Sequence, residues 1–433
     1  MYTTRAVTAV AAAVLSTAAL TGAASPARPA SSSSPAAAAC AASWKLVPTP
    51  APPGAYTSMY AAAATSANDA WFAGYEPPVA GVGDGIATAL PWVLHWNGRS
   101  LDAAPAVPQP AFFAPRTASA ESFDSRADGW LLGQSMNPGG TPLEADTYVP
   151  YAARWNGGRW TITPLAISPD PASAAATPDP TAVASLSPSD AWIVGGFGPE
   201  GPQGQTNGAM IEHWDGSTWS IIPNPASSDA DSVLSSITAV SATDIWAVGL
   251  QNANGEGGQR PLAEHWDGTA WSVVAVPAGN PAQSKFIAIS ADGPDDVWAV
   301  GSHLEPGTSD LATALVEHWD GTAWTAVTGL PDLGNSLVNA VYAASPSDVW
   351  AIVETVAPQG ANFPFLFEFL HWDGSNWTTV PLPGPKENGL QYLAMSLSGS
   401  GPDDIWAAGF ISHSLNGTEE PMIAHLSCGT GGQ

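Results

Sequence analysis

Basic residues are scarce in this chain, and it has only one long apolar run. Eleven Lys and Arg stand against 38 Asp and Glu, which gives a formal net charge of −27. A surface of this charge repels the phosphates of a nucleic acid, so we expect no nucleic-acid partner. The apolar run over residues 6–20 is shorter than a helix needs to cross a bilayer, so we expect no membrane span.

Local catalytic motifs are also lacking. The sequence contains no Gly-x-Ser-x-Gly elbow, no His-Glu-x-x-His run, no phosphate-binding glycine loop and no Cys-x-x-Cys pair. We therefore expect no catalytic residue, no resident cofactor and no metal site. Calcium alone stays open, because it takes oxygen ligands and two acidic pairs lie in loops, Asp229 with Asp231 and Asp292 with Asp295.

The amino-terminal composition predicts export. Over residues 1–24, Arg5 precedes the apolar run and small residues follow it, which is typical of a secretory signal peptide. Residues 25–39 are almost wholly Ala, Ser and Pro, which predicts a flexible linker. We expect residues 40–433 to form a single domain and the mature protein to be secreted.

Tryptophan is abundant and periodic. Nineteen of the twenty tryptophans fall into three columns of a unit that occurs seven times. The first column lies in an Asp-x-Trp-x-x-Gly block and contains Trp71, Trp130, Trp192, Trp246, Trp298, Trp350 and Trp406. The second lies in a His-Trp-Asp-Gly block and contains Trp96, Trp155, Trp214, Trp266, Trp319 and Trp372, with Leu426 in the seventh copy. The third contains Trp160, Trp219, Trp271, Trp324, Trp377 and Trp44, with Leu101 in the first copy. Core packing is the expected role of these indoles.

Each unit predicts four short strands. In the fourth copy these are residues 236–242, 245–249, 261–266 and 271–276, and Asp267-Gly268 is a favoured hairpin turn that places Trp266 opposite Trp271. Four such strands are typical of a propeller blade. The predicted fold class is therefore all-β, a seven-bladed β-propeller of four-stranded antiparallel blades. The expected blade limits are 51–108, 109–166, 167–225, 226–277, 278–331, 332–383, and 384–428 together with 43–50.

The two chain ends predict how the ring closes. The seventh copy has no fourth strand of its own, whereas Trp44 and its neighbours match the fourth-strand pattern. We expect this N-terminal strand to complete the last blade, which leaves no open sheet edge. Cys40 and Cys428 align with the same turn, so we predict a disulfide bond between them, as an exported protein with an even number of cysteines allows.

Loop lengths indicate where function lies. The turns between the first and second strands, and between the third and fourth, are short and uniform. The other connections vary in length and share the opposite face of a propeller, which we call the loop face. Candidate ligand-binding residues on it are Tyr75, Glu76, Phe112, Phe113, Arg116, Glu256, Arg260, His303, Glu305 and His413. The repeated histidines and aspartates occur once per blade and cannot form one site, and we expect the aspartates to accept main-chain hydrogen bonds.

The repeat resembles known propeller repeats. The blocks Ile-Trp-Ala-Val-Gly at 245–249 and Glu-His-Trp-Asp-Gly-Thr-Ala-Trp at 264–271 resemble repeats of exported propeller proteins from high-GC Gram-positive bacteria. They are also similar to kelch repeats and to the wider WD40, YVTN and BNR group. The resemblance spans residues 43–428 and implies the fold, but its motifs are structural and imply no activity. The arginine triad of sialidases is not matched, since only Arg116 and Arg260 fall on the loop face.

These observations favour a secreted, monomeric binding protein without catalysis that holds a protein or an envelope polymer on its loop face. A carbohydrate-binding propeller is the alternative, because Phe112, Phe113 and Tyr75 can stack on sugar rings. Its partner would be an extracellular polysaccharide or cell-wall polymer. A hydrolase or lyase built from Glu200, Glu256, Glu305 and His303 is a third hypothesis, since propeller active sites need no local motif.

Overall fold

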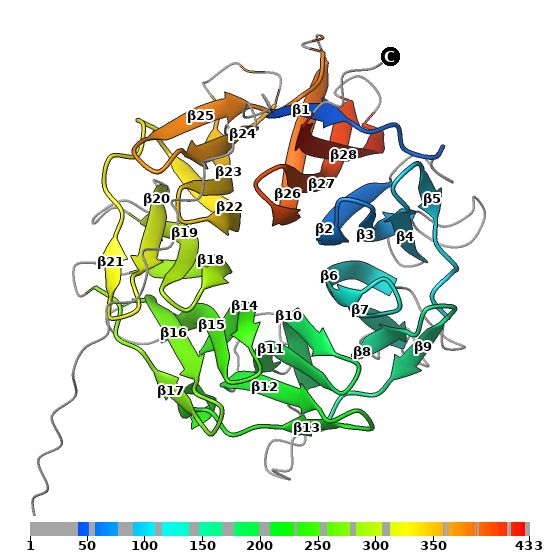
Figure 1. Ribbon diagram of the computed structural model, residues 1–433, viewed down its shortest axis with the longest axis vertical. Coiled ribbons are helices and arrows are strands. Elements are labelled where there is room, and N and C mark those ends of the chain that lie inside the picture. The colour runs from blue at the N-terminus through cyan, green and yellow to red at the C-terminus, as the bar shows by residue number, and fades with distance from the viewer. Residues whose placement is uncertain are drawn as a thin grey trace, which may run out of the picture. The chain divides into compact units, whose positions relative to one another are not determined.

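Seven four-stranded antiparallel sheets stand around a central axis in the computed structural model (Figure 1). The structure describes residues 42–51, 57–76, 90–108, 115–137, 147–166, 177–198, 208–228, 232–251, 258–277, 283–304, 312–357, 361, 363–385, 387, 389–413 and 417–428. In blades 1 to 6 the four strands follow one another in chain order from the axis outward (Figure 1). The predicted seven-bladed propeller is confirmed.

The strands have the following bounds. Blade 1 comprises β2 (Ser58–Ser66), β3 (Asp69–Glu76), β4 (Leu90–Trp96) and β5 (Leu101–Ala103), and blade 2 comprises β6 (Pro115–Ser125), β7 (Asp128–Asn137), β8 (Thr147–Trp155) and β9 (Trp160–Thr163). Blade 3 comprises β10 (Thr177–Ser187), β11 (Asp190–Gly198), β12 (Ala209–Trp214) and β13 (Trp219–Ile221), and blade 4 comprises β14 (Val233–Ser241), β15 (Asp244–Gln251), β16 (Arg260–Trp266) and β17 (Trp271–Val273). Blade 5 comprises β18 (Ser284–Gly293), β19 (Asp296–Leu304), β20 (Ala312–Trp319) and β21 (Trp324–Ala326), and blade 6 comprises β22 (Ser336–Ser345), β23 (Asp348–Val356), β24 (Phe365–Trp372) and β25 (Trp377–Pro381). Blade 7 comprises β26 (Leu390–Gly401), β27 (Asp404–His413), β28 (Glu419–Cys428) and β1 (Ala42–Leu46).

Helix is limited, in the described part of the chain, to one 3-10 turn, η3 (Pro225–Ser228). No helix there is long and apolar enough to cross a membrane.

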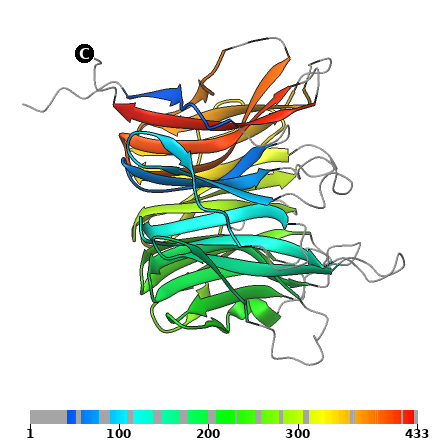
Figure 2. The same ribbon diagram turned by 90° about the vertical axis from the view of Figure 1, so that its right-hand side faces the viewer.

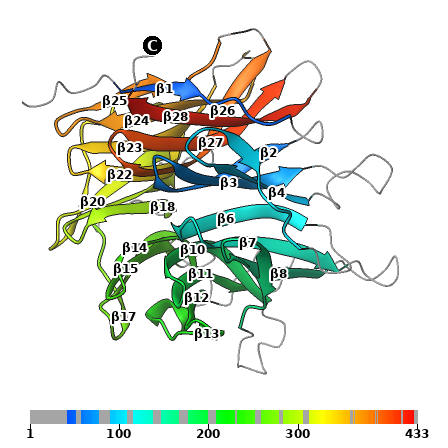
Figure 3. The ribbon, with the colours of Figure 1, turned by 45° about the vertical axis from the view of Figure 1, so that its right-hand side comes forward.

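The N-terminal strand completes the last blade, as predicted. Strand β1 pairs with β28 in antiparallel register and places Trp44 opposite Leu426. Figures 2 and 3 show this first strand lying beside the last. The ladder continues to Ala42 and Cys428, two pairs beyond the point at which the hairpins of the other blades turn. Cys40 lies outside the described residues, so the disulfide bond stays a prediction.

Indole packing joins neighbouring blades. Trp266 lies opposite Trp271 as predicted. Each outer-strand indole also contacts the central-strand indole of the preceding blade, with ring centroids 4.8–6.3 Å apart. The pairs are Trp160 on Trp71, Trp219 on Trp130, Trp271 on Trp192, Trp324 on Trp246, Trp377 on Trp298 and Trp44 on Trp350. The expected core role of the tryptophans is thus confirmed.

The glycine of the Asp-x-Trp-x-x-Gly block makes room for a bulge in the inner strand. Every inner strand has a register shift beside this position, as between Leu234 and Ser236 in blade 4. A Cβ atom added to Gly249 would lie 2.1 Å from the carbonyl oxygen of Val233. At Gly249 the neighbouring strand therefore approaches too closely for a side chain, whereas blade 6 keeps the same bulge with Val353 in this position.

Serine side chains bond to the inner edge of the ring. An innermost strand has unpaired main-chain groups on its axial side, where no further strand can pair with it. The amides of Ala62 and Ala64 in blade 1 donate to Ser396 Oγ and Ser398 Oγ of blade 7, at 3.1 and 2.9 Å. Ser122, Ser236 and Ser290 accept in the same way from the following blade. These bonds tie adjacent blades together near the axis.

Buried glutamates anchor the connections between blades. Glu212 and Glu264 are fully buried, and their carboxylates accept hydrogen bonds from the amides of Ala166 and Ala226, each at 2.9 Å. Both amides belong to the segment that arrives from the preceding blade. Burial raises the pKa of each carboxyl from 4.5 to about 7, although the amide hydrogen bond opposes the shift.

We predict that replacing Gly249 with Ala destabilises the fold. The added methyl group collides with main chain rather than with a movable side chain, and overpacking of this kind costs about 1–3 kcal/mol. The measurement is urea unfolding followed by tryptophan fluorescence. Gly293→Ala is the control, because no atom lies within 4 Å of its added Cβ. Equal losses in the two variants would contradict the explanation.

We predict that stability falls as the pH rises from about 4.5 to about 7. In the unfolded chain Glu212 and Glu264 lose their protons near pH 4.5, whereas in the folded protein they keep them to about pH 7. Their contribution to the free energy of unfolding is therefore complete below pH 4.5 and is lost as the pH rises to about 7. The loss is at most about 3 kcal/mol for each group. Unfolding of the Glu212→Gln/Glu264→Gln variant across this range should show a flatter pH dependence. Glu368→Gln, on an exposed side chain, should leave the wild-type slope unchanged.

Candidate functional site

The repeated Asp and His residues pair within each blade. The Nε2 atom of the histidine lies 2.6–2.9 Å from the Oδ1 atom of the aspartate in six blades. The pairs are His95–Asp69, His213–Asp190, His265–Asp244, His318–Asp296, His371–Asp348 and His425–Asp404. Side chains therefore take the place of the main-chain donors that we expected for the aspartates.

An indole covers each of these imidazoles. The histidine ring lies 3.7–4.4 Å, centroid to centroid, from the first-column tryptophan of its own blade. The arrangement fixes the imidazole between an aspartate and a tryptophan, and it recurs once per blade. We assign it a structural role, because the six pairs are separated around the ring and meet at no common point.

Blade 2 replaces the histidine with arginine. Arg154 Nη2 lies 2.7 Å from Asp128 Oδ1 and donates to the carbonyl oxygen of Pro188 at 2.7 Å. Its guanidinium also lies 5.6 Å from the ring centroids of both Trp130 and Trp214. The longer arginine side chain thus bonds to the next blade, whereas the six repeated histidines pair with aspartates of their own blades.

Four candidate residues have described side chains near strand ends on the loop face. Tyr75 lies one residue before the end of β3, and His303 lies one residue before the end of β19. Arg260 begins β16 and His413 ends β27. They belong to blades 1, 4, 5 and 7, so the structure does not bring all four together. Glu76 and Arg116 are described only in their main chain, and Phe112, Phe113, Glu256 and Glu305 lie outside the described residues.

Tyr75 belongs to an aromatic cluster between blades 7 and 1. Its ring stacks on Tyr60 at 5.6 Å, and Tyr60 in turn lies 6.1 Å from Phe410. Burial, and then the neighbouring Tyr75 and Glu419, raise the pKa of Tyr60. Ser58 donates a hydrogen bond to Glu419 beside the cluster. This packing joins the two blades and keeps Tyr60 neutral.

A groove opens between blades 6 and 7. Its volume is about 420 Å³, and its lining comes from β24, β25, the connection to blade 7 and the start of β26. The lining residues are Leu366, Phe367, Glu368, Pro381, Leu382, Gly384, Pro385, Glu387, Leu390, Gln391 and Tyr392. Gln391 Nε2 donates to the carbonyl oxygen of Phe365, which connects the two walls.

Apolar side chains are exposed at the edge of this groove. Val356, Phe365 and Leu366 are 46%, 40% and 46% exposed, and the register pairs Val356 with Phe365. The other exposed large apolar side chains in the described ranges are Leu90, at 37%, and Val273, at 49%. Three of these five side chains lie on the hairpin formed by β23 and β24. This end of blade 6 is therefore the apolar part of the loop face.

Acidic side chains are present in the groove. Glu368 and Glu387 belong to its described lining, which contains no Lys or Arg, while Lys386 between Pro385 and Glu387 lies outside the described residues. Burial, followed by Glu387 and Glu420, raises the pKa of Tyr392, which places Glu420 near the same wall. Glu420 Oε1 also lies 3.5 Å from His413 Nε2. Glu420 therefore connects the candidate residue His413 to the groove wall that contains Tyr392. Sequence reasoning missed the groove itself, because its walls are formed by residues outside the repeat columns.

No group of three or more His, Cys, Asp or Glu side chains suited to a metal ion occurs in the part of the chain that the structure describes. Of the acidic pairs considered for calcium, Asp229 and Asp231 fall outside that part, and Asp292 and Asp295 belong to no such group.

Comparison with known proteins identifies the architecture. No protein-family model and no curated protein matches this chain. The solved structure of YCF48 from Cyanidioschyzon merolae is 14% identical, with a TM-score of 0.50 over 89% of this chain and 98% of its own. The β-propeller domain of the trilobed protease from Pyrococcus furiosus is 8% identical, with a TM-score of 0.44 over 84% and 97%. Trypanosoma rangeli sialidase is 9% identical, with a TM-score of 0.45 over 86% of this chain and 55% of its own. The likeness to YCF48 shows the propeller fold alone.

We predict that Arg154→Ala destabilises the propeller by about 2–3 kcal/mol, because it leaves the carboxylate of Asp128, 6% exposed, without its cation. Arg154→His should recover part of this loss, since it restores the pair found in six blades. Urea unfolding of the three proteins is the measurement. Equal stability of the Ala and His variants would contradict a role for the ion pair.

Proposed function

We propose that this protein is a binding propeller without catalysis that holds an apolar, positively charged segment of a partner protein in the groove between blades 6 and 7. The exposed trio Val356, Phe365 and Leu366 carries the proposal. These side chains remain in water in the free protein, and covering them recovers about 25 cal/mol for each Å² of apolar surface buried.

Charge specifies the partner further. The described lining of the groove combines two glutamates with apolar side chains. A basic side chain next to apolar ones would meet Glu368 or Glu387 while its neighbours cover the hairpin. The tyrosine and phenylalanine rings also suit a sugar, so a carbohydrate ligand is the second candidate.

We further propose that the protein acts outside the cytoplasm as a monomer, with a disulfide bond between Cys40 and Cys428. The pairing of Ala42 with Cys428 supports the bond, because it brings the two segments that carry the cysteines side by side. An oxidising compartment would keep such a bond intact.

The test is binding of a fluorescent amphipathic peptide that contains Leu and Lys, measured by anisotropy. We expect Val356→Ser/Leu366→Ser to weaken binding about tenfold or more, because the apolar contact is lost. Glu368→Gln/Glu387→Gln should weaken it and reduce its dependence on salt. Val273→Ser is the matched control, since Val273 is 49% exposed on another blade.

Equal loss in the Val273 variant, or none in the groove variants, would overturn the proposal. A parallel titration uses soluble neutral and acidic oligosaccharides with Tyr392→Ala. Saccharide binding that this change removes, without peptide binding, would establish the carbohydrate alternative instead.

A further inference from the structure

The interface between blades 7 and 1 lacks the indole pair of the other six. The outer-strand position of blade 1 holds Leu101, so Trp406 of blade 7 contacts Phe72 and Trp96, at 5.4 and 5.5 Å between ring centroids. Leu101 is 7% exposed and belongs to the apolar cluster around Trp406. Because leucine is much smaller than tryptophan, less of the outer part of this interface is filled.

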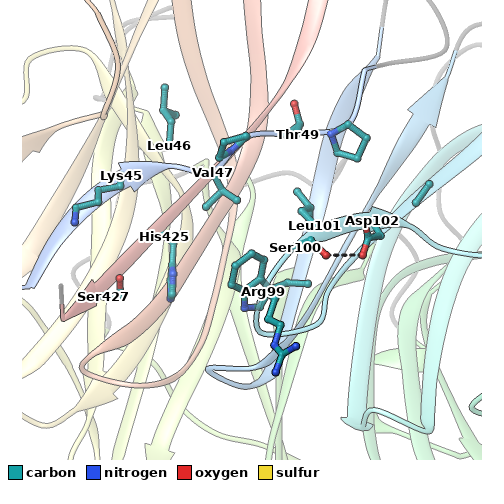
Figure 4. A pocket seen from close by; sticks show the side chains of 14 residues that line it. Lys45, Leu46, Val47, Thr49, Arg99, Ser100, Leu101, Asp102, His425 and Ser427 are labelled. Atoms are coloured by element: carbon teal, nitrogen blue, oxygen red, sulfur yellow. Dashed lines mark hydrogen bonds between the residues drawn. The ribbon is translucent and has the colours of Figure 1, made fainter. Parts of the chain in front are cut away.

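A cavity of about 720 Å³ lies at this interface, on the outer side of the ring (Figure 4). One wall is β1 with the residues that follow it, and the other is the turn between β4 and β5. Val47, Pro48, Pro50 and the Trp96 ring supply its apolar lining. The cavity is therefore bounded by the strand that closes the ring and by the first complete blade.

Two cations at this cavity depart from the repeat. The residue opposite the repeated His or Arg on the outer strand is Ser or Thr in five blades, but Lys45 in blade 7. The turn position of Arg99 holds Gly, Ser or Thr in blades 2 to 6. Leu101 is a third departure, and Asp102, which takes the Ser or Thr position in blade 1, is a fourth. These four departures from the repeat meet at one place, in a chain with few basic residues.

The cations are available to a ligand. Lys45 and Arg99 are both exposed, and neither has a recorded ion pair. The carboxylate of Asp102 accepts from Asn97 Nδ2 and Ser100 Oγ, at 2.9 and 2.7 Å, so donors of its own turn engage it. Figure 4 shows Lys45 on one side of the cavity and Arg99 on the other, with His425 between them.

We propose that this cavity binds a short acidic oligosaccharide whose carboxylates meet Lys45 and Arg99. Arginine and lysine bind carboxylates through charge-assisted hydrogen bonds. The indole of Trp96 and the two prolines provide surfaces for a sugar ring, and Thr49, Ser100 and Ser427 offer hydroxyl groups. The separation of the cations on opposite walls selects a ligand with more than one carboxylate. This site is distinct from the loop-face groove, which is acidic.

Occupancy would stabilise the closure of the ring. The proposed ligand contacts blade 7 through β1 and blade 1 through its outer turn. A ligand that binds only the folded state stabilises it by RT ln(1 + [L]/Kd), so the melting temperature rises with the ligand concentration. A stability shift is thus a second readout that does not depend on the binding assay.

The experiment titrates the full chain with trigalacturonate by calorimetry, beside a neutral galactose trisaccharide and triaspartate peptide. We expect binding of trigalacturonate alone, accompanied by a rise in melting temperature. Lys45→Ala and Arg99→Ala should each weaken it about tenfold. Leu101→Trp should abolish it by filling the cavity with the residue that six other blades carry, without lowering the melting temperature of the free protein.

Arg159→Ala is the matched control, because Arg159 lies in the corresponding turn of blade 2. It should leave binding unchanged. Retained affinity in Leu101→Trp would place the ligand elsewhere and overturn the proposal. Equal binding of the neutral trisaccharide would remove the role of the cations, and binding of triaspartate in place of the saccharide would overturn the assignment of the ligand class.

Discussion

Indole packing between neighbouring blades is the interaction on which the ring depends. A sheet of four short strands has two apolar faces and cannot bury either alone, so each blade is stable only against its neighbours. The central tryptophan of one blade and the outer tryptophan of the next fill this space at six interfaces. In six of the seven units, the aspartate and histidine then hold an imidazole against the central indole. Near the axis, the bulge beside the glycine shapes the inner strand, and serine side chains bond it to the neighbouring blade.

The two proposed binding surfaces lie where this unit is interrupted. At blade 6 the hairpin ends in exposed apolar residues, and the described lining of the groove beside it includes glutamates. Between blades 7 and 1, leucine and two cations replace the usual residues. The two places differ in their side chains and are formed by different elements, so we propose different ligands for them. The repeated residues build the fold, and the residues that depart from the repeat form the proposed sites.

Much of the fold could be predicted because the tryptophan columns report packing directly. The closing strand was predicted because Trp44 and its neighbours match the fourth-strand pattern that the seventh copy lacks. The pairing of Asp404 with His425 was not foreseen, because the sequence does not say which donor reaches a carboxylate across a sheet. The groove was missed for a related reason. Its walls, from Leu366 to Tyr392, come together only through the path of the connection between two blades. The sequence showed Leu101 as an exception in the third tryptophan column. The cavity beside it could not be predicted, because its other wall depends on the path of β1 and the residues that follow it.

The closing strand also determines when the propeller can be completed. Residues 42 to 46 are synthesised before the other described strands, yet their partner strand β28 is the last of these strands in chain order. Blades 1 to 6 are each formed from consecutive residues and can assemble as they emerge, whereas blade 7 must wait for contacts that span nearly the whole chain. Such long-range contacts are slow to form, because closing a long loop costs entropy before any contact compensates for it. Until then β1 and β28 both present open edges, and the nascent chain is most exposed to aggregation at this last step.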